Sequence, residues 1–293
     1  MPRPTRTAAA SAAAIGVFAA AFAGCKTVEE RTVASNHRDW APDQAVLPTA
    51  EFAGDRLKVR NVRYCKHLGP GEYVVDHDDR EYDLSRLRGV DFVTMPFGPV
   101  PALAHTMVSF EFAPTPPRRD PEHLAVSVEV RKEKGEERFN PALGLAQQYE
   151  IMYVVADERD LLYRQAVTYD GPTYLYRTTA SPEAARELLV DMLSRANDLA
   201  ENPEFYHLLT NNCTTNIAQH INRIRPNRIV YDASVLLPGY SDQKAFAEGL
   251  LVTGGESFEQ LKARSLINTR ARVAANDPSV DFSRAIRGET HLR

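Results

Sequence analysis

Alternating polar and apolar positions predict three β-strands in the middle of the chain. Segments 56–64, 104–112 and 123–132 each repeat with a period of two, as half-buried strands do. Segment 149–169 predicts either two further strands or a strand followed by a short helix. Segment 69–84, GPGEYVVDHDDREYDL, is rich in turn residues and acidic. It predicts a solvated loop, although Asp76, His77, Asp78 and Asp79 also suggest a metal site.

Helical patterns follow the strands. Segment 182–200 carries an apolar stripe every three or four residues, with Pro182 at its first position and Ser181 as the N-cap. A second helix is expected to begin at Asn212 or Cys213, after a cluster of small polar residues. Short helices and loops fill the C-terminal part. Strands followed by helices predict an α+β fold, an antiparallel sheet packed against helices.

Composition narrows the class of protein. The chain has 293 residues, with 35 Lys and Arg against 39 Asp and Glu, a net charge of −4. A general nucleic-acid binder needs a basic excess, so no nucleic-acid partner is expected. The hydrophobic content of 43% is ordinary for a soluble protein, and the length allows one large domain or two small ones. No glycine-rich phosphate loop, CxxC pair or HExxH motif is present, so no metal or organic cofactor is expected.

The first 25 residues are typical of an export signal. Arg3 and Arg6 precede a run of about 17 apolar, alanine-rich residues, and FAGC resembles a bacterial lipobox. The expected mature chain therefore starts at Cys25, which bears lipid; plain secretion and an uncleaved anchor are the alternatives. Residues 26–50 are predicted to form a tether, and residues 51–293 the folded domain. Lys26 after the cysteine favours, by resemblance to Gram-negative lipoproteins, the periplasmic side of the outer membrane.

Two cysteines remain in the exported part, and Cys213 stands in the sequence NNCTTN. One hypothesis is a disulfide between Cys65 and Cys213, since exported cysteines often pair. The other is a nucleophile, because a thiolate is stabilised at a helix N-terminus and by a neighbouring imidazole. The backbone N–H groups of that first turn also point toward a developing oxyanion.

The imidazole must come from elsewhere in the fold. His220 lies two turns along the same helix, roughly 10 Å away, which is too far to take the thiol proton. Most other histidines lie in loop-like or terminal sequence, which leaves His105 and His123 as candidates. His105 begins a strongly alternating strand and shares one face with Met107. A lone strand histidine is more often structural than catalytic, so the residues alone leave both interpretations open.

The span from Trp40 to about Arg287 resembles the Lnb N-terminal periplasmic domain family, long described as a domain of unknown function. The resemblance rests on eight stretches in the family's order: WAPDQAVLP, VRNVRY, DFVTMPFG, LAHTMVSFEF, LAVSVEVRKEKGE, QYEIMYVVADERDLLYRQ, PEFYHLLTNNCTTNI and DFSRAIR. That family is similar to circularly permuted NlpC-type and papain-like thiol enzymes, and lecithin:retinol acyltransferase has the same permuted order. The implied fold is a permuted papain-like domain.

The resemblance implies roles for individual residues. His105 would be the general base and Cys213 the nucleophile. The orienting group would lie on the following strand, and it would be Glu129 or Ser127. Beyond the resemblance, Asn211 and Asn212 are candidates for an oxyanion donor, although capping alone explains Asn212. Tyr206 is a candidate for lining the acyl-binding cleft, and the alternative is that it packs the helix start.

The implied reaction is acyl transfer or hydrolysis through a thioester. By resemblance to Lnb, which N-acylates bacterial lipoproteins, the donor would be a phospholipid and the acceptor a lipoprotein amine, with the membrane reached through the lipid on Cys25. No segment after the Cys213 helix resembles the membrane-spanning part of that acyltransferase. Two alternatives stay open: a peptidoglycan amidohydrolase, as in the NlpC-type relatives, and a non-catalytic envelope binding module.

Overall fold

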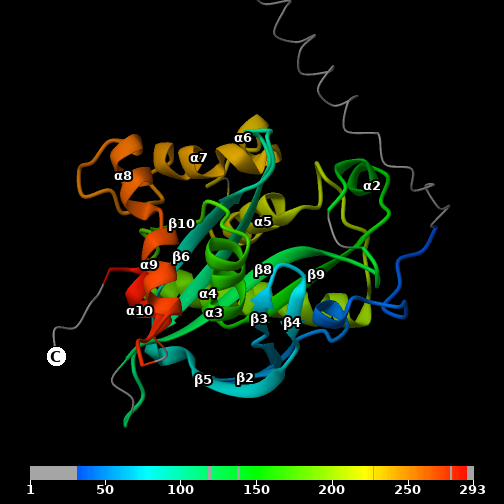
Figure 1. Ribbon diagram of the computed structural model, residues 1–293, viewed down its shortest axis with the longest axis horizontal. Helices are drawn as coiled ribbons and strands as arrows, with labels where there is room; N and C mark the ends of the chain where they lie inside the picture. The colour runs from blue at the N-terminus through cyan, green and yellow to red at the C-terminus, as the bar shows by residue number, and fades with distance from the viewer. Residues whose placement is uncertain (1–31, 118–119, 137–138, 227, 278, 289–293) are drawn as a thin grey trace, which may run out of the picture.

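The structure, a computed structural model, describes residues 32–117, 120–136, 139–226, 228–277 and 279–288. Within them a mixed eight-stranded sheet has the order β1-β2-β9-β8-β7-β6-β10, and β5 pairs with β2 (Figure 1). A separate ribbon contains β3 (Lys66–Gly69) and β4 (Glu72–Val74). The strands of the main sheet are β1 (Thr49–Ala53), β2 (Arg56–Arg63), β5 (His77–Asp83), β6 (Leu87–Pro96), β7 (Ala104–Phe112), β8 (Glu122–Arg131), β9 (Glu150–Ala156) and β10 (Tyr174–Arg177).

Helices cover both faces of the sheet. One hydrophobic core joins one face to α4 and α5, and a second core joins the other face to α3, α9 and α10. The α-helices are α2 (Pro141–Leu145), α3 (Glu158–Tyr163), α4 (Pro182–Glu201), α5 (Cys213–Ile224), α6 (Ala233–Leu236), α7 (Ser241–Ala247), α8 (Phe258–Ser265), α9 (Asn268–Ala275) and α10 (Phe282–Ile286). Short 3-10 turns occupy η1 (Pro42–Gln44), η2 (Leu84–Arg86) and η4 (Pro238–Tyr240), and a π-helical turn occupies η3 (Arg164–Thr168).

The predicted α+β class is confirmed, and the strongest local signals placed their elements correctly. Helix α4 starts at Pro182, and the Ser181 side chain accepts a hydrogen bond from the N–H of Ala184. The apolar stripe of α4 is buried against the sheet. Strands β2, β7 and β8 occur where alternation predicts them, and segment 149–169 forms a strand followed by a short helix, β9 and α3.

Two expectations about the sheet are wrong. Segment 69–84 is not a loop, because it contains β4 and β5. The charges of β5 lie on an exposed part of the sheet and pair with β2; Arg56 and Glu81 are one such pair, at 2.6 Å. The sheet is also not wholly antiparallel, since β2 and β9 run parallel and meet at Arg63 and Ala156.

Residues 40–50, assigned above to a tether, contribute to the folded part. Trp40 and Gln44 are buried. The Arg131 guanidinium lies over the Trp40 ring, 4.3 Å from its centre. The folded part therefore begins near Trp40 rather than at residue 51.

The predicted export signal and the lipid-bearing Cys25 lie outside the described residues. In the part of the chain that the structure describes, no helix has the length and hydropathy needed to cross a membrane.

Candidate active site

Cys213 is the first residue of α5, and the turn that presents it is fixed by side-chain caps. The Asn212 side chain accepts a hydrogen bond from the N–H of Thr215 at 2.9 Å, and the Thr215 hydroxyl accepts one from the N–H of Asn212 at 2.9 Å. This reciprocal capping box stabilises the helix start. Cys213 itself is only 5% exposed, so its thiol lies at a desolvated helix N-terminus.

His105, the second residue of β7, lies beside the Cys213 thiol. Burial raises the pKa of Cys213, but the hydrogen bond to His105 and the charge of its imidazole outweigh burial and lower the pKa to about 7. Burial lowers the pKa of His105, but the interactions with Cys213 and with the Glu129 charge together raise it above its ordinary value. The hydroxyl and backbone N–H of Thr106 also stabilise the thiolate. The residues 105 and 213, 108 positions apart, form one thiol–imidazole pair.

A second hydrogen bond orients the imidazole from strand β8. Nε2 of His105 lies 2.6 Å from the Ser127 hydroxyl, and that hydroxyl donates to Oε1 of Glu129 at 3.0 Å. Because the single Ser127 proton is donated to the carboxylate, Nε2 of His105 must be the donor in the first bond. Nδ1 is then the basic nitrogen available to the thiol proton. Ser127 therefore contacts the imidazole directly, and Glu129 acts on the imidazole through its hydrogen bond to Ser127.

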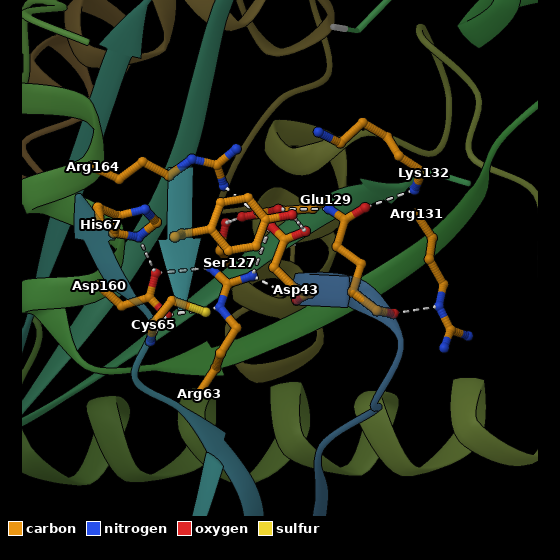
Figure 2. Close-up of polar contacts among 12 residues, drawn as sticks. Asp43, Arg63, Cys65, His67, Ser127, Glu129, Arg131, Lys132, Asp160 and Arg164 are labelled. Carbon is orange, nitrogen blue, oxygen red and sulfur yellow. Dashed lines mark hydrogen bonds and ion pairs between the residues drawn. The ribbon is translucent and has the colours of Figure 1, made fainter. Parts of the chain in front are cut away.

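A buried arginine, which the sequence analysis did not single out, lies under this site. Burial raises the pKa of Glu129, and the Arg63 guanidinium together with His105 outweighs burial and lowers it. Arg63 makes two hydrogen bonds to Asp160, of 2.8 and 3.1 Å, and donates to the backbone oxygen of Asp43. Figure 2 shows Arg63 between these partners, with Glu129 and Ser127 alongside. Glu129 thus remains an anion in a protein interior.

Asp160 also accepts hydrogen bonds from the neighbours of Arg63. The backbone N–H of Cys65 donates to it at 2.9 Å, and Nε2 of His67 lies 3.0 Å away (Figure 2). Burial, and then the Asp160 charge, raise the pKa of the Cys65 thiol to about 12. Cys65 and Cys213 are both free, so the disulfide hypothesis is wrong. The surroundings therefore raise the pKa of the Cys65 thiol and lower the pKa of the Cys213 thiol.

Asn211 and Asn212 each direct an amide at the backbone of the preceding loop. Nδ2 of Asn212 donates to the Leu208 carbonyl at 2.6 Å, and Nδ2 of Asn211 donates to the Phe205 carbonyl at 2.9 Å. The structure shows the capping role that was the alternative for Asn212, since its side-chain oxygen accepts from the N–H of Thr215. Cys213 and Thr214 are the first two residues of α5, and the first N–H groups of a helix have no partner within it.

Tyr206 lies close to the thiol. It is 7% exposed, and burial followed by the charge of Cys213 raises its pKa well above the ordinary value. Its ring packs edge-on against Phe139, with centroids 5.9 Å apart. Tyr206 therefore packs the helix start close to the nucleophile, which is the alternative interpretation, and a role in lining an acyl-binding cleft stays a prediction.

The other candidate residues take structural positions. His220 bridges Asp191 and the Tyr153 hydroxyl, each at 2.5 Å, and burial lowers its pKa to about 4. His123 lies toward the other end of β8, where the charges of Glu158 and Arg287 act on it. Over the residues that the structure describes, no three His, Cys, Asp or Glu side chains gather as a metal site.

The Ser127–Glu129 relay leads to a testable ranking. Ser127→Ala should lower the rate of Cys213 acylation about 10- to 100-fold, the value of a hydrogen bond to a charged group. Glu129→Gln should cost less, since Ser127 can still donate to an amide oxygen. The measurement is the acylation rate against pH for both variants and for Ser127→Thr, which keeps the hydroxyl. A larger loss in Glu129→Gln than in Ser127→Ala would contradict the order of the relay.

Comparison with protein families adds an independent observation. The model of the Lnb N-terminal periplasmic domain matches residues 73–239, which is 167 of the 293 residues. The match contains His105, Ser127, Glu129 and Cys213, whereas Arg63 lies before it. No curated protein and no solved structure matches the chain. Since the family model covers more than half of the sequence, the chain belongs to the Lnb N-terminal periplasmic domain family, and its matched region is a periplasmic domain.

Proposed function

We propose that the protein is a cysteine-dependent acyltransferase of the cell envelope, with Cys213 as nucleophile and His105 as general base. The observation that carries the proposal is the buried pair of Cys213 and His105, in which the imidazole lowers the thiol pKa to about 7. A nucleophile at the start of a helix, a base in contact with it and a third group orienting the base form the arrangement that thiol enzymes need.

The proposed reaction has two halves. In the first, the Cys213 sulfur attacks an ester carbonyl and a C–S bond forms. The C–O bond to the alcohol then breaks, and the departing alcohol takes the thiol proton through His105. In the second, an amine or water attacks the thioester and gives a proton to His105. The C–S bond then breaks, and the sulfur leaves as thiolate. The N–H groups of Cys213 and Thr214, at the start of α5, would stabilise the oxyanion of both halves.

By analogy with Lnb, the acyl donor is a phospholipid and the acceptor is a lipoprotein amine. A lipid on Cys25 would hold the domain at the outer membrane, close to both. A circularly permuted papain-like fold is part of the same proposal. It is supported by the chain order, with the histidine on strand β7 and the cysteine on the later helix α5.

Trapping the intermediate tests this function. Incubation with diacyl phospholipid, followed by acid quenching and peptide mass spectrometry, should find an acyl chain on Cys213. Hydroxylamine should release it, as expected of a thioester, and Cys213→Ala should carry none. The parallel incubation uses purified peptidoglycan. Cleavage of peptidoglycan that needs Cys213, with no acyl adduct, would replace this proposal by the amidohydrolase alternative. No reaction in either incubation would favour a binding module.

A further inference from the structure

An apolar pocket of about 360 Å³ lies between the sheet and helices α4, α5, α6 and α7. Strands β6 and β7 supply its sheet side, and one face of α5 forms the opposite wall; Figure 1 shows α5 with α6 and α7 nearby. Aliphatic and aromatic side chains dominate the lining, among them Val90, Phe92, Val108, Ile217, Ala218 and Ile221. An apolar cavity of about 150 Å³ holds one benzene molecule, so this pocket has room for an alkyl chain of about a dozen carbons.

The pocket begins beside the nucleophile. Thr214 lines it, and Oγ1 of Thr214 lies 3.9 Å from the Cys213 sulfur and 3.1 Å from the Thr106 hydroxyl. A single side chain therefore separates the sulfur from the pocket. From Thr214 the lining follows α5 to Arg225, roughly 16 Å along the helix axis. The pocket therefore extends along α5 from the residue next to the nucleophile toward the end of that helix.

The polar groups of the lining do not favour a sugar or a peptide. The three cations that line the pocket are already paired with acidic side chains: Arg225 with Glu187, Arg228 with Glu248, and Lys244 with Asp232 and Glu248. A site for a polar ligand needs several convergent groups free to hydrogen-bond to it. Here the groups that converge on the interior are mainly methyl and methylene groups. This chemistry favours a hydrocarbon chain.

We propose that this pocket holds the alkyl chain of the acyl group on Cys213, and that Ala218 limits the chain length. The inference rests on the proposed acyl transfer, whose substrate class it specifies as long-chain acyl compounds. Ala218 lies one turn beyond Thr214 on the same face of α5 and is 4% exposed. A larger side chain at position 218 would fill the part of the pocket between Thr214 and Arg225. Ala184, half-buried in the first turn of α4, lines the pocket from the opposite side.

The first experiment uses p-nitrophenyl esters from acetyl to dodecanoyl, with peptide mass spectrometry of Cys213. The acylation rate constant should rise with chain length, by up to about fourfold for each methylene buried. Ala218→Phe should lower the ratio of the dodecanoyl rate to the acetyl rate at least about tenfold, the equivalent of two buried methylenes. Ala184→Phe, at a more exposed position, provides a second test if Ala218→Phe does not fold. Ala247→Phe, an exposed position of α7 outside the pocket, is the matched control.

A binding measurement separates this inference from the proposed function. Cys213→Ala protein should still bind cis-parinaric acid, a fluorescent fatty acid, and Ala218→Phe should weaken that binding about tenfold. Binding without any ester acylation of Cys213 would overturn the acyltransferase and keep the chain site. Acylation that is independent of chain length, or absent fatty-acid binding, would overturn the chain site and keep the thiol chemistry.

Discussion

His105→Ala should move the pH midpoint of Cys213 alkylation up by two units or more. In the intact protein the interaction with His105 holds the pKa of Cys213 at about 7, against about 9 for an ordinary thiol. The variant keeps the burial that raises this pKa and loses the imidazole that lowers it. Acyl transfer should fall about 10²- to 10⁴-fold, since the general base is also lost. The measurement is iodoacetamide labelling from pH 5 to 10, quantified on the peptide that carries Cys213.

The midpoint is a better measure than the rate at one pH. A more basic thiolate is intrinsically more nucleophilic, so the rate at pH 7 falls less than the thiolate fraction does. His37→Ala, which removes an exposed histidine, should leave the midpoint at its original value. Cys65 should stay unlabelled over most of this range, because burial and the Asp160 charge raise its pKa to about 12. A midpoint in His105→Ala that equals that of the intact protein would remove His105 from the proposed mechanism.

Local chemistry explains which elements the sequence could predict. Ser181 and Pro182 specify the start of α4, and Asn212 with Thr215 specifies the start of α5; each signal acts within four residues. Strand β7 is equally clear, because the polar residues His105, Ser109 and Glu111 alternate with apolar ones, although both faces are buried along most of the strand. Patterns of this kind need no knowledge of distant partners.

The missed elements depend on partners that are distant in the sequence. Strand β6 is buried along nearly its whole length, because it lies between β7 and β10 with both faces covered, so its sequence shows no regular division into a polar and an apolar face. Strand β5 has an acidic sequence that resembles a loop until β2 supplies Arg56, Lys58 and Arg60 opposite its charges. Gln44 near the start of the folded part is buried against strand β8, where it donates to Glu129 and to the carbonyl of Val130. No local pattern contains this information.

The sequence predicts which residues form the candidate site, but it does not predict whether Ser127 or Glu129 contacts His105. Alternation placed Ser127 and Glu129 on one face of a strand, but both fit the role of orienting His105. The structure distinguishes them, since Ser127 contacts the imidazole and Glu129 contacts Ser127. The sequence pattern around Arg63 predicts only a half-buried strand, and its burial depends on Asp160, which lies 97 residues away in the sequence. An ion pair between residues so far apart in the sequence leaves no periodic pattern from which it could be predicted.

The buried ion pair of Arg63 and Asp160 leads to a second prediction, a large loss of stability when it is broken. Arg63→Met should lower the free energy of unfolding by about 3–5 kcal/mol, because the variant leaves the Asp160 carboxylate without its guanidinium. The side chains of Arg63 and Asp160 are 3% and 0% exposed, so water cannot replace the lost partner. Arg56→Met is the matched control on the same strand. Arg56 and Glu81 are 65% and 52% exposed, and solvent already screens their charges, so the control should unfold almost as the intact protein does. Urea unfolding of the three proteins provides the comparison.

The pH dependence of the same experiment identifies the charge as the cause. Arg63 and His67 hold the pKa of Asp160 below its ordinary value, although burial alone would raise it. A carboxylate with a depressed pKa contributes stability above its unfolded pKa of about 4, and that contribution is lost as the pH falls through the folded value. The difference between Arg63→Met and the intact protein should therefore be largest near pH 7 and shrink below about pH 4. A difference that stays constant with pH would mean that Arg63 stabilises β2 through packing of its methylenes instead. Glu129, which depends on the same guanidinium, would then have to owe its depressed pKa to His105 and Arg164.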